Sequence, residues 1–201
     1  MAEMMDFCGF PKIARLSREV IVTEKIDGTN AQVYIGADGT ILAGSRTRWI
    51  TPDDDNFGFA AWVAGHREEL LTLGPGRHFG EWWGRGIQRH YGAPDRRWSL
   101  FNTVRWALPG SDPQPIPTGD PRVVKMQDVL PPCCSLVPVL WRGNFDDLNV
   151  TSLMVELAAT GSRAWLGFPK PEGIVLFHVA GGVAFKKTLD RDDEPKGRAR
   201  G

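Results

Sequence analysis

The sequence predicts an α+β domain built of antiparallel sheets with few helices. Short runs rich in β-branched and aromatic residues alternate with turn residues from residue 20 onward. Two longer segments, 56–73 and 146–159, carry apolar residues at helical spacing. The 201 residues, 42% hydrophobic and 24% charged, are enough for one domain with a full core.

The first half of the chain is expected to form strands at residues 20–26, 31–35, 41–43 and 77–83. We expect antiparallel hairpins here, because Asp27-Gly28 after the first strand is a strong hairpin signal. Lys25 would then be held at a strand edge. One amphipathic helix at 56–73 should end at Gly74-Pro75-Gly76.

The second half begins with a proline-rich surface loop at 109–121, followed by strand character at 123–130 and 136–141. A second helix at 146–159 should end at Thr160-Gly161-Ser162. Residues 174–177 and 183–185 predict a last hairpin. We assign residues 1–188 to one domain and residues 189–201, which are charged and almost without apolar side chains, to a flexible tail.

Composition narrows the function classes. With 24 basic and 24 acidic residues the net charge is zero, so any nucleic-acid surface must be local. The chain has no signal-peptide pattern and no apolar stretch long enough to cross a membrane, so we expect a cytoplasmic protein. Its three cysteines, expected to be buried thiols, fit neither a disulfide framework nor a zinc site, and its four histidines have no ligand spacing.

No P-loop or GxGxxG fingerprint is present, so a nucleotide site needs another architecture. Six polar islands in or beside apolar strands supply one: EKIDGTN at 24–30, SRTR at 45–48, FGEWWG at 79–84, LFN at 100–102, PEGIVLF at 171–177 and AFKK at 184–187. Taken alone, the first island is also consistent with an ordinary hairpin that carries a solvated Lys25.

In this order the islands resemble the covalent nucleotidyltransferases, the superfamily of ATP-dependent polynucleotide ligases and mRNA capping enzymes. The closest resemblance, over about residues 20–187, is to the T4 RNA ligase 2-like RNA ligases, because EKIDGTN is similar both before the lysine and at Asn30. The resemblance implies a nucleotidyltransferase (adenylation) domain in which two antiparallel sheets flank an ATP cleft. It also implies ATP and Mg²⁺ (or Mn²⁺) as cofactors, and a reaction that joins 3′-hydroxyl and 5′-phosphate RNA ends through a lysyl-AMP and an adenylylated 5′-phosphate.

The chemistry of that reaction assigns roles to the basic residues. An amine that attacks the α-phosphorus of ATP must be deprotonated, which desolvation or neighbouring cations favour in a lysine. Lys25 is the candidate nucleophile. Arg46, Lys186 and Lys187 are the candidate cations that neutralise charge developing on the phosphates. The resemblance places Arg46 at the nucleotide sugar and the 3′-end of the strand, and the two closing lysines at the α-phosphate.

Magnesium bridges phosphate oxygens and keeps several waters, so it needs only one or two carboxylates. Glu81 and Glu172 are the candidates, with Asp27 as an outer partner. The resemblance also gives Glu81 a ribose hydrogen bond and places Glu24 at the adenine edge. It places Phe101 on the adenine face.

Two features depart from the family pattern. The closing motif usually reads lysine, any residue, lysine, whereas Lys186 and Lys187 are adjacent here, and strict alternation sends them to opposite faces. Which one meets the phosphate stays open. The chain also stops about 14 residues later, where related enzymes carry an OB-fold or a helical domain. We therefore expect either a minimal ligase with no OB-fold or one that depends on a protein partner.

Two alternatives remain: the catalytic domain of an ATP-dependent DNA ligase, and a non-catalytic nucleotide- or nucleic-acid-binding module. The intact Lys25, Glu81, Glu172 and lysine pair argue against the second. For RNA, or a nicked RNA/DNA duplex, we expect a strand-binding surface of arginines interleaved with aromatic residues. Its members are Arg85, Arg89, Arg96, Arg97, Trp83, Tyr91 and Trp98.

Overall fold

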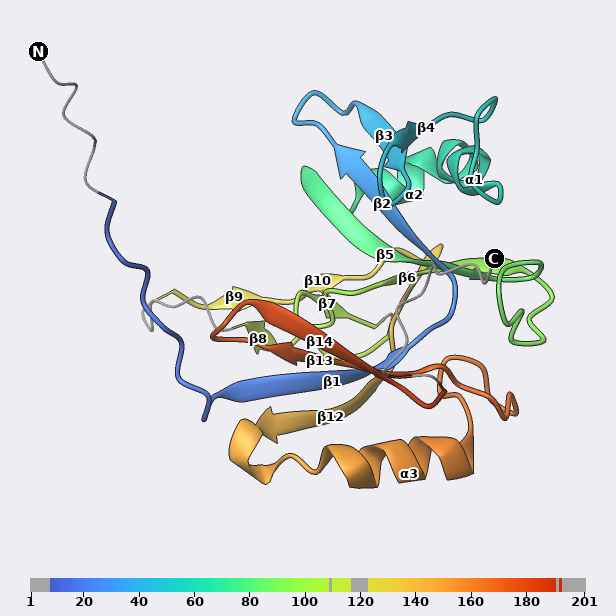
Figure 1. Cartoon of the computed structure of the whole chain (residues 1–201). Coiled ribbons are helices and arrows are strands. Elements are labelled where there is room, and N and C mark those ends of the chain that lie inside the picture. The colour runs from blue at the N-terminus through green and yellow to red at the C-terminus, as the bar shows by residue number, and fades with distance from the viewer. Residues whose placement is uncertain (1–7, 109, 117–122, 191, 193–201) are drawn as a thin grey trace, which may run out of the picture.

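The computed structural model describes residues 8–108, 110–116, 123–190 and 192, and two large sheets dominate it (Figure 1). The lower one is a four-stranded antiparallel sheet in the order β12-β1-β13-β14. Its strands are β1 (Glu19–Lys25), β12 (Val139–Asn144), β13 (Gly173–His178) and β14 (Val183–Thr188). The last two form the hairpin expected from the sequence, which is confirmed.

The second sheet has six strands in the order β11-β6-β5-β2-β3-β4. They are β2 (Thr29–Ile35), β3 (Ile41–Gly44), β4 (Trp49–Ile50), β5 (Gly76–Gly84), β6 (Arg96–Leu100) and β11 (Cys134–Leu136). It is not purely antiparallel as expected, because β11 joins β6 in parallel.

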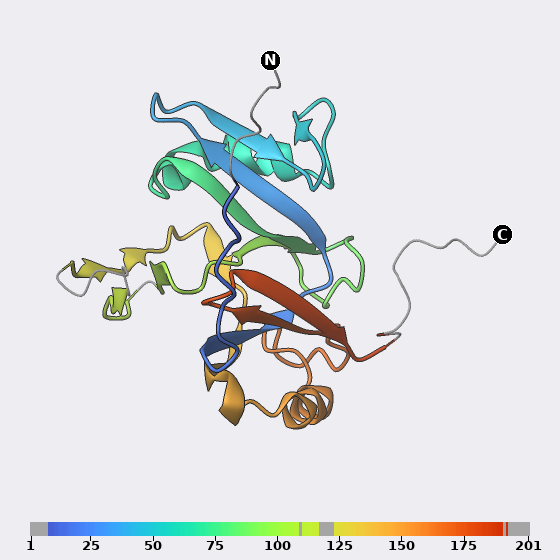
Figure 2. The same ribbon diagram turned by 60° about the vertical axis from the view of Figure 1, so that its left-hand side comes forward.

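Two small ribbons project to one side of the large sheets (Figure 2). One pairs β7 (Trp106–Ala107) with β10 (Asp128–Val129) in parallel, and the other pairs β8 (Pro115–Ile116) with β9 (Lys125–Met126). The strands expected at 123–130 and 136–141 are therefore each divided. The second of these splits between two sheets beside Pro138, which has no N–H for a ladder. Part of the expected loop at 109–121 lies outside the described residues.

The prediction of one continuous helix at 56–73 is wrong, because the segment forms two short helices, α1 (Phe59–Gly65) and α2 (Arg67–Leu71). They meet at His66, whose φ of −112° leaves the helical range and whose ring Nδ1 lies 2.9 Å from the Trp62 carbonyl oxygen. The second expected helix also starts later, at α3 (Val150–Thr160), after a 3₁₀ turn, η1 (Phe145–Asp147). Asn149 caps α3 by accepting a hydrogen bond from the Ser152 N–H at 2.9 Å.

Each large sheet buries one face against helices. The α1 and α2 helices cover the six-stranded sheet, where Val33, Phe59, Leu70, Trp82 and Trp98 share one apolar cluster. The α3 helix covers the four-stranded sheet, with a cluster of Val20, Val22, Met154, Leu157 and Ile174. The opposite faces of both sheets are left for the site described below.

The Asp27-Gly28 turn is not a hairpin, contrary to expectation. β1 pairs with β12 and β13, while β2 pairs with β3 and β5, so the chain crosses here from one sheet to the other. A Cβ on Gly28 would lie 2.4 Å from the Trp82 carbonyl oxygen, so only glycine lets the crossover pass this close to β5. Lys25 consequently ends a central strand beside the crossover.

The cysteines only partly match the expected burial, since Cys134 is buried, Cys133 is half-buried and Cys8 is exposed. None of the described helices is long and apolar enough to cross a membrane.

Candidate active site

A cavity of about 1630 Å³ lies at the crossover and is lined by strands of both large sheets. Its lining includes every site residue expected from the sequence except one: Glu24, Lys25, Asp27, Asn30, Arg46, Glu81, Phe101, Glu172 and Lys186. The exception is Lys187. The fold thus gathers residues that are up to 162 positions apart in the sequence, from Glu24 to Lys186, into one cavity.

Lys25 and Glu172 form an ion pair at the end of β1. The register pairs Lys25 with Gly173 on β13, which places Glu172 directly beside the amine. Lys25 Nζ donates to Glu172 Oε2 at 2.7 Å, and the two side chains are 19% and 2% exposed. Because the carboxylate is buried, loss of either partner would leave a charge in a poorly solvated place.

Strand register separates the two closing lysines. Lys186 lies opposite Val175, which lies opposite Thr23, so Lys186 shares the cavity face of the sheet with Thr23 and Lys25. Lys187 points to the other face, and its Nζ donates to Asp192 Oδ2 at 2.9 Å. The geometry therefore presents Lys186, not Lys187, to a ligand in the cavity.

Glu81 enters the cavity from β5, in the other sheet. Its Oε1 accepts the Gly28 N–H at 3.1 Å, and its Oε2 accepts Asn30 Nδ2 at 3.2 Å. Burial raises the pKa of Glu81 to about 7, opposed by the attraction of Lys25 and increased by the negative charges of Glu172 and Asp27. The two carboxylates thus lie close enough to interact electrostatically.

The donor set around Glu81 and Glu172 fits a hard divalent cation. Carboxylate oxygens are the ligands that Mg²⁺ and Mn²⁺ prefer, and a shared cation would relieve the repulsion that raises the Glu81 pKa. No group of three or more His, Cys, Asp or Glu side chains within the described part of the chain could hold a metal by itself. A cation here would depend on ligand oxygens and water for its remaining contacts.

Glu24 points away from the Lys25 amine, and both of its carboxylate oxygens accept hydrogen bonds from the protein. Its Oε1 accepts from Ser162 Oγ at 2.6 Å, and its Oε2 accepts the backbone N–H groups of Arg163 and Ala164 at 2.7 and 2.9 Å. Burial raises the Glu24 pKa, although these hydrogen bonds oppose the shift. Glu24 anchors the 162–164 loop, and its contact with adenine stays a prediction. From the sequence, Ser162 was expected only at the end of a helix.

The prediction of a strand-binding surface made of arginines and aromatic residues is wrong for its three aromatic members. Trp83, Tyr91 and Trp98 are 2%, 1% and 0% exposed and cannot stack on bases. The Tyr91 hydroxyl instead accepts the Asp27 N–H at 2.8 Å, under the crossover.

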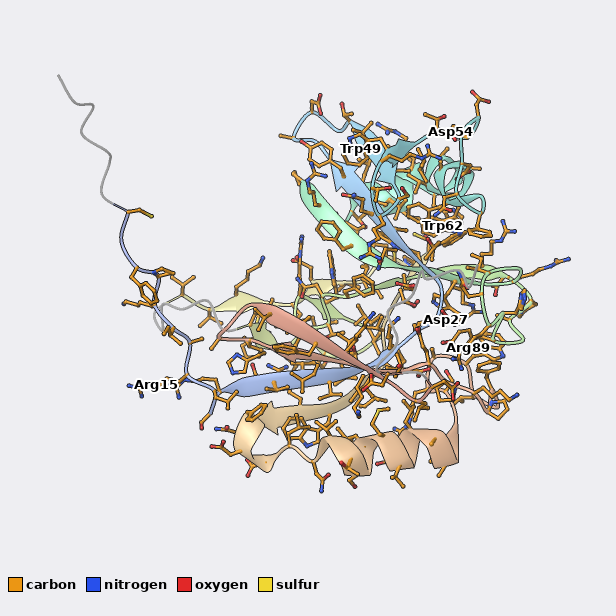
Figure 3. All side chains as sticks on the ribbon, in the orientation of Figure 1. Arg15, Asp27, Trp49, Asp54, Trp62 and Arg89 are labelled. Atoms are coloured by element: carbon orange, nitrogen blue, oxygen red, sulfur yellow. The ribbon has the colours of Figure 1, made fainter. Side chains whose placement is uncertain are left out.

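Arg89 is a structural clamp that the sequence did not reveal. Its Nε donates to Asp27 Oδ2 at 3.1 Å, and its Nη1 donates to the carbonyl oxygens of Lys170 and Pro171 at 3.0 and 3.3 Å. Figure 3 shows Asp27 and Arg89 next to each other, and both line the cavity. The glycines at 84, 86 and 92, all with positive φ, were the one available signal of a tight loop here.

Arg46 and Phe101 reach the cavity from the six-stranded sheet. Arg46 lies in the β3–β4 turn, closed by the Ser45 N–H bonding the Arg48 carbonyl oxygen at 2.8 Å. Phe101 follows β6 and is 42% exposed, so its ring is open to a ligand and not part of a core. Their contacts with a nucleotide stay predictions.

Comparison with known proteins gives the chain a family. A family model described as RNA ligase matches residues 18–188. No curated protein sequence matches. Among solved structures, a Naegleria gruberi RNA ligase variant with ATP and Mn is similar with a TM-score of 0.57 and 18% identity, covering 87% of this chain and 51% of that chain. Another variant of the same enzyme, with AMP and Mn, has a TM-score of 0.55 and 19% identity, covering 86% and 50%.

At these identities the structural likeness shows the fold alone, and the chain spans about half the length of those proteins. The family match is independent of the structures and covers both sheets and the whole cavity lining up to Thr188. The chain therefore belongs to the RNA ligase family.

Proposed function

We propose that this chain is the adenylation domain of an ATP-dependent RNA ligase of the T4 RNA ligase 2-like branch, and that the cavity between its two sheets is the ATP cleft. The observation that carries the proposal is the Lys25 amine, which is held by buried Glu172 on the same sheet face as Lys186. Family membership and the solved relatives that hold ATP or AMP with Mn support ATP and a divalent cation as cofactors.

The first step is attack of Lys25 Nζ on the α-phosphorus of ATP. A P–N bond forms, the bond to the bridging oxygen breaks, and pyrophosphate leaves. The ammonium must first lose a proton, and Glu172 Oε2, 2.7 Å from Nζ, is placed to accept it. Lys186 neutralises charge that develops on the α-phosphate. A divalent cation held by Glu81 and Glu172 supplies further neutralisation of phosphate oxygens when bound.

Two transfers complete the reaction. The oxygen of an RNA 5′-phosphate attacks the lysyl-AMP phosphorus, which frees Lys25 and leaves the 5′-end adenylylated. A 3′-hydroxyl then attacks that 5′-phosphate, forms the phosphodiester and releases AMP. Asn30, which donates to Glu81, borders the place where the 5′-phosphate would arrive.

The test is transfer of label from α-labelled ATP to the protein. Wild-type protein with magnesium or manganese should retain labelled AMP after denaturation, and Lys25→Ala should retain none. Lys170→Ala, an exposed lysine outside the cavity, is the matched control and should label as wild type does. A wild-type protein that takes up no label would refute the proposal, and preferential labelling from GTP would point to capping chemistry.

A second assay separates the substrates. Nicked duplexes that differ only in RNA or DNA on the 3′-hydroxyl side test recognition of the 2′-hydroxyl. Faster sealing of the RNA end supports an RNA ligase. Equal sealing of an all-DNA end would favour the DNA ligase alternative while leaving the lysyl-AMP chemistry in place. Asn30→Ala should still form lysyl-AMP but seal poorly.

A further inference from the structure

The six-stranded sheet has one face without a helix, and aromatic side chains gather on it. Its members, here called the aromatic face, are Gln32, Tyr34, Trp49, Arg77 and Phe79. Residues 77 and 79 alternate along β5 with buried His78, and 32 and 34 alternate along β2 with buried Val33, so all four point away from α1 and α2. Trp49 is 42% and Phe79 51% exposed. In Figure 3 Trp49 lies well apart from Trp62 of α1.

The aromatic face has a fixed arrangement. Arg77 Cζ lies 5.3 Å from the centre of the Tyr34 ring and 5.2 Å from that of Trp49, within the range of cation–π attraction. Its Nη1 also donates to Gln32 Oε1 at 3.0 Å. Gly44 makes room for the Trp49 ring, because a Cβ there would come within 3.0 Å of Trp49 Cε3. Aromatic rings held in this way need little ordering when a ligand arrives.

This face continues directly into the cavity. On β2 and β5 the pair of Asn30 and Glu81 lies at the cavity, and the pairs farther out carry the aromatic face. From Glu81 to Arg77 is four residues of strand, or about 13 Å. Phe79 also touches the cavity lining through its carbonyl oxygen, which accepts the Phe101 N–H at 3.0 Å. A chain that left the cavity along β5 would cross Phe79 and then Arg77.

The charge on this route is positive and uncompensated. Within the described ranges of the chain, neither Arg77 nor Arg46 forms an ion pair with a carboxylate, whereas the neighbouring Arg48 is paired with Asp54. Arginines beside exposed rings match a strand of phosphates and unpaired bases, since phosphates take the charge and every base has a face that can stack. A helical duplex fits less well, because its bases already stack on one another.

We propose that the aromatic face binds an unpaired RNA strand that leaves the cavity, with bases stacked on Trp49 and Phe79 and a phosphate near Arg77. This inference rests on the proposed function for the class of ligand. It adds a binding surface outside the ATP cleft.

The test is binding of an unstructured, dye-labelled RNA oligonucleotide, followed by fluorescence anisotropy at several salt concentrations and without ATP. Trp49→Ala should raise the Kd roughly tenfold, the size of one lost base stack, and Trp49→Phe should raise it less. Arg77→Ala should raise the Kd and lower the slope of log Kd against log salt by about one. Trp49 is 42% exposed, so its truncation should lower the melting temperature only slightly.

Arg67→Ala is the matched control. It removes the same charge from α2, the helix on the opposite side of the six-stranded sheet, where Arg67 donates only to the Gly39 carbonyl oxygen among the contacts described. An equal effect of Arg67→Ala and Arg77→Ala would overturn the proposal in favour of general attraction. So would a Trp49→Ala variant that binds RNA as wild type does, or one that loses affinity equally for a blunt RNA duplex.

The outcome is independent of the ligase chemistry. Because ATP is absent, a protein that fails to form lysyl-AMP can still show RNA binding that depends on Trp49. Conversely, a protein that labels normally can show none, which would reject the aromatic face alone.

Discussion

The two sheets that line the cavity differ in how their charges are held. On the four-stranded side the amine of Lys25 is paired with buried Glu172, while Lys186 on the same sheet face forms no ion pair with any described residue. On the six-stranded side Glu81 is buried next to other carboxylates with a raised pKa, and Arg46 forms no ion pair with any described residue. The Lys25 amine is therefore held in place before a ligand arrives, whereas the charges of Glu81 and Arg46 on the other wall are not balanced by partners of opposite charge.

This difference indicates that the paired and the unpaired charges have different roles. Paired, buried charges fix the position of a nucleophile, because each partner holds the other in a place with little solvent. Unpaired cations and crowded carboxylates cost stability in the free protein and recover it when phosphates and a cation bind. Breaking the Lys25–Glu172 pair should therefore destabilise the free protein, whereas removing the charge of Glu81 should stabilise it.

Loss of Glu172 should have the largest effect. Glu172→Ala leaves Lys25 without its partner, so the free energy of unfolding should fall by about 3 kcal/mol, the lower end for a broken buried pair because Lys25 is 19% exposed. Lysyl-AMP formation should fall by about two orders of magnitude or more. Urea denaturation and label transfer measure the two effects. The control Glu156→Ala breaks an exposed pair with Arg163 and should cost under about 1 kcal/mol. Equal losses in the two variants would contradict the comparison.

Glu81 should make stability depend on pH. Its pKa is about 7 in the folded protein against 4.5 when unfolded, so the folded state prefers the protonated acid. The stabilisation is fully present below pH 4.5 and is lost as pH rises through 7, a change of about 3 kcal/mol. Glu81→Gln stays neutral, so without divalent cations it should be more stable than wild type by about that amount at pH 8 and similar at pH 4.5. Denaturation curves at both pH values decide this, with exposed Glu68→Gln as the control.

The adjacent lysines test the same comparison within one strand. Lys186→Ala should slow lysyl-AMP formation by about two orders of magnitude, because Lys186 shares the cavity face with Lys25. Lys187→Ala should lose an exposed pair with Asp192, worth under about 1 kcal/mol of stability, and slow labelling much less. The ratio of the two single-turnover rates is the measurement. A ratio near one would mean that the strand slips or bulges when ATP binds.

The order of the motifs was enough to predict which residues line the cavity, although their roles stay predictions. Lys25, Glu81, Glu172 and Lys186 were all expected at one cavity, and each lines it. Strand alternation indicated that Lys186 and Lys187 point to opposite faces of the sheet. The sequence alone could not show which of them faces the cavity, because it does not give the register of strand pairing. Only pairing with Val175 and Thr23 shows which lysine faces the cavity.

The sequence failed where local signals competed with tertiary contacts. Asp27-Gly28 has the residue types of a hairpin turn, yet the glycine is needed for close approach to Trp82, which lies 54 positions later in the sequence. The apolar spacing at 56–73 predicted one helix that continues through His66. That spacing carries no information about the contact of the His66 ring with the Trp62 carbonyl oxygen, which lies at the junction of the two helices. Arg89 was expected in a strand-binding surface, since nothing near it in sequence reveals its contacts with Asp27 and Pro171.

The smallest expected effect is at Arg89. A substitution there tests whether the contacts of Arg89 at the crossover are structural. Arg89 Nε donates to Asp27, and its Nη1 donates to both carbonyl oxygens just before Glu172. Lysine keeps the charge but has one compact ammonium, so Arg89→Lys can satisfy only some of these acceptors. We expect the free energy of unfolding to fall by about 1 kcal/mol, the size of one or two lost hydrogen bonds. Lysyl-AMP formation should slow by less than about tenfold, because the ion pair between Lys25 and Glu172 remains intact. Arg163→Lys, an exposed arginine paired with Glu156, is the control for the exchange itself. Should Arg89→Lys match that control in urea denaturation while labelling falls a hundredfold, Arg89 would act on the ligand directly, and the clamp would not be its role.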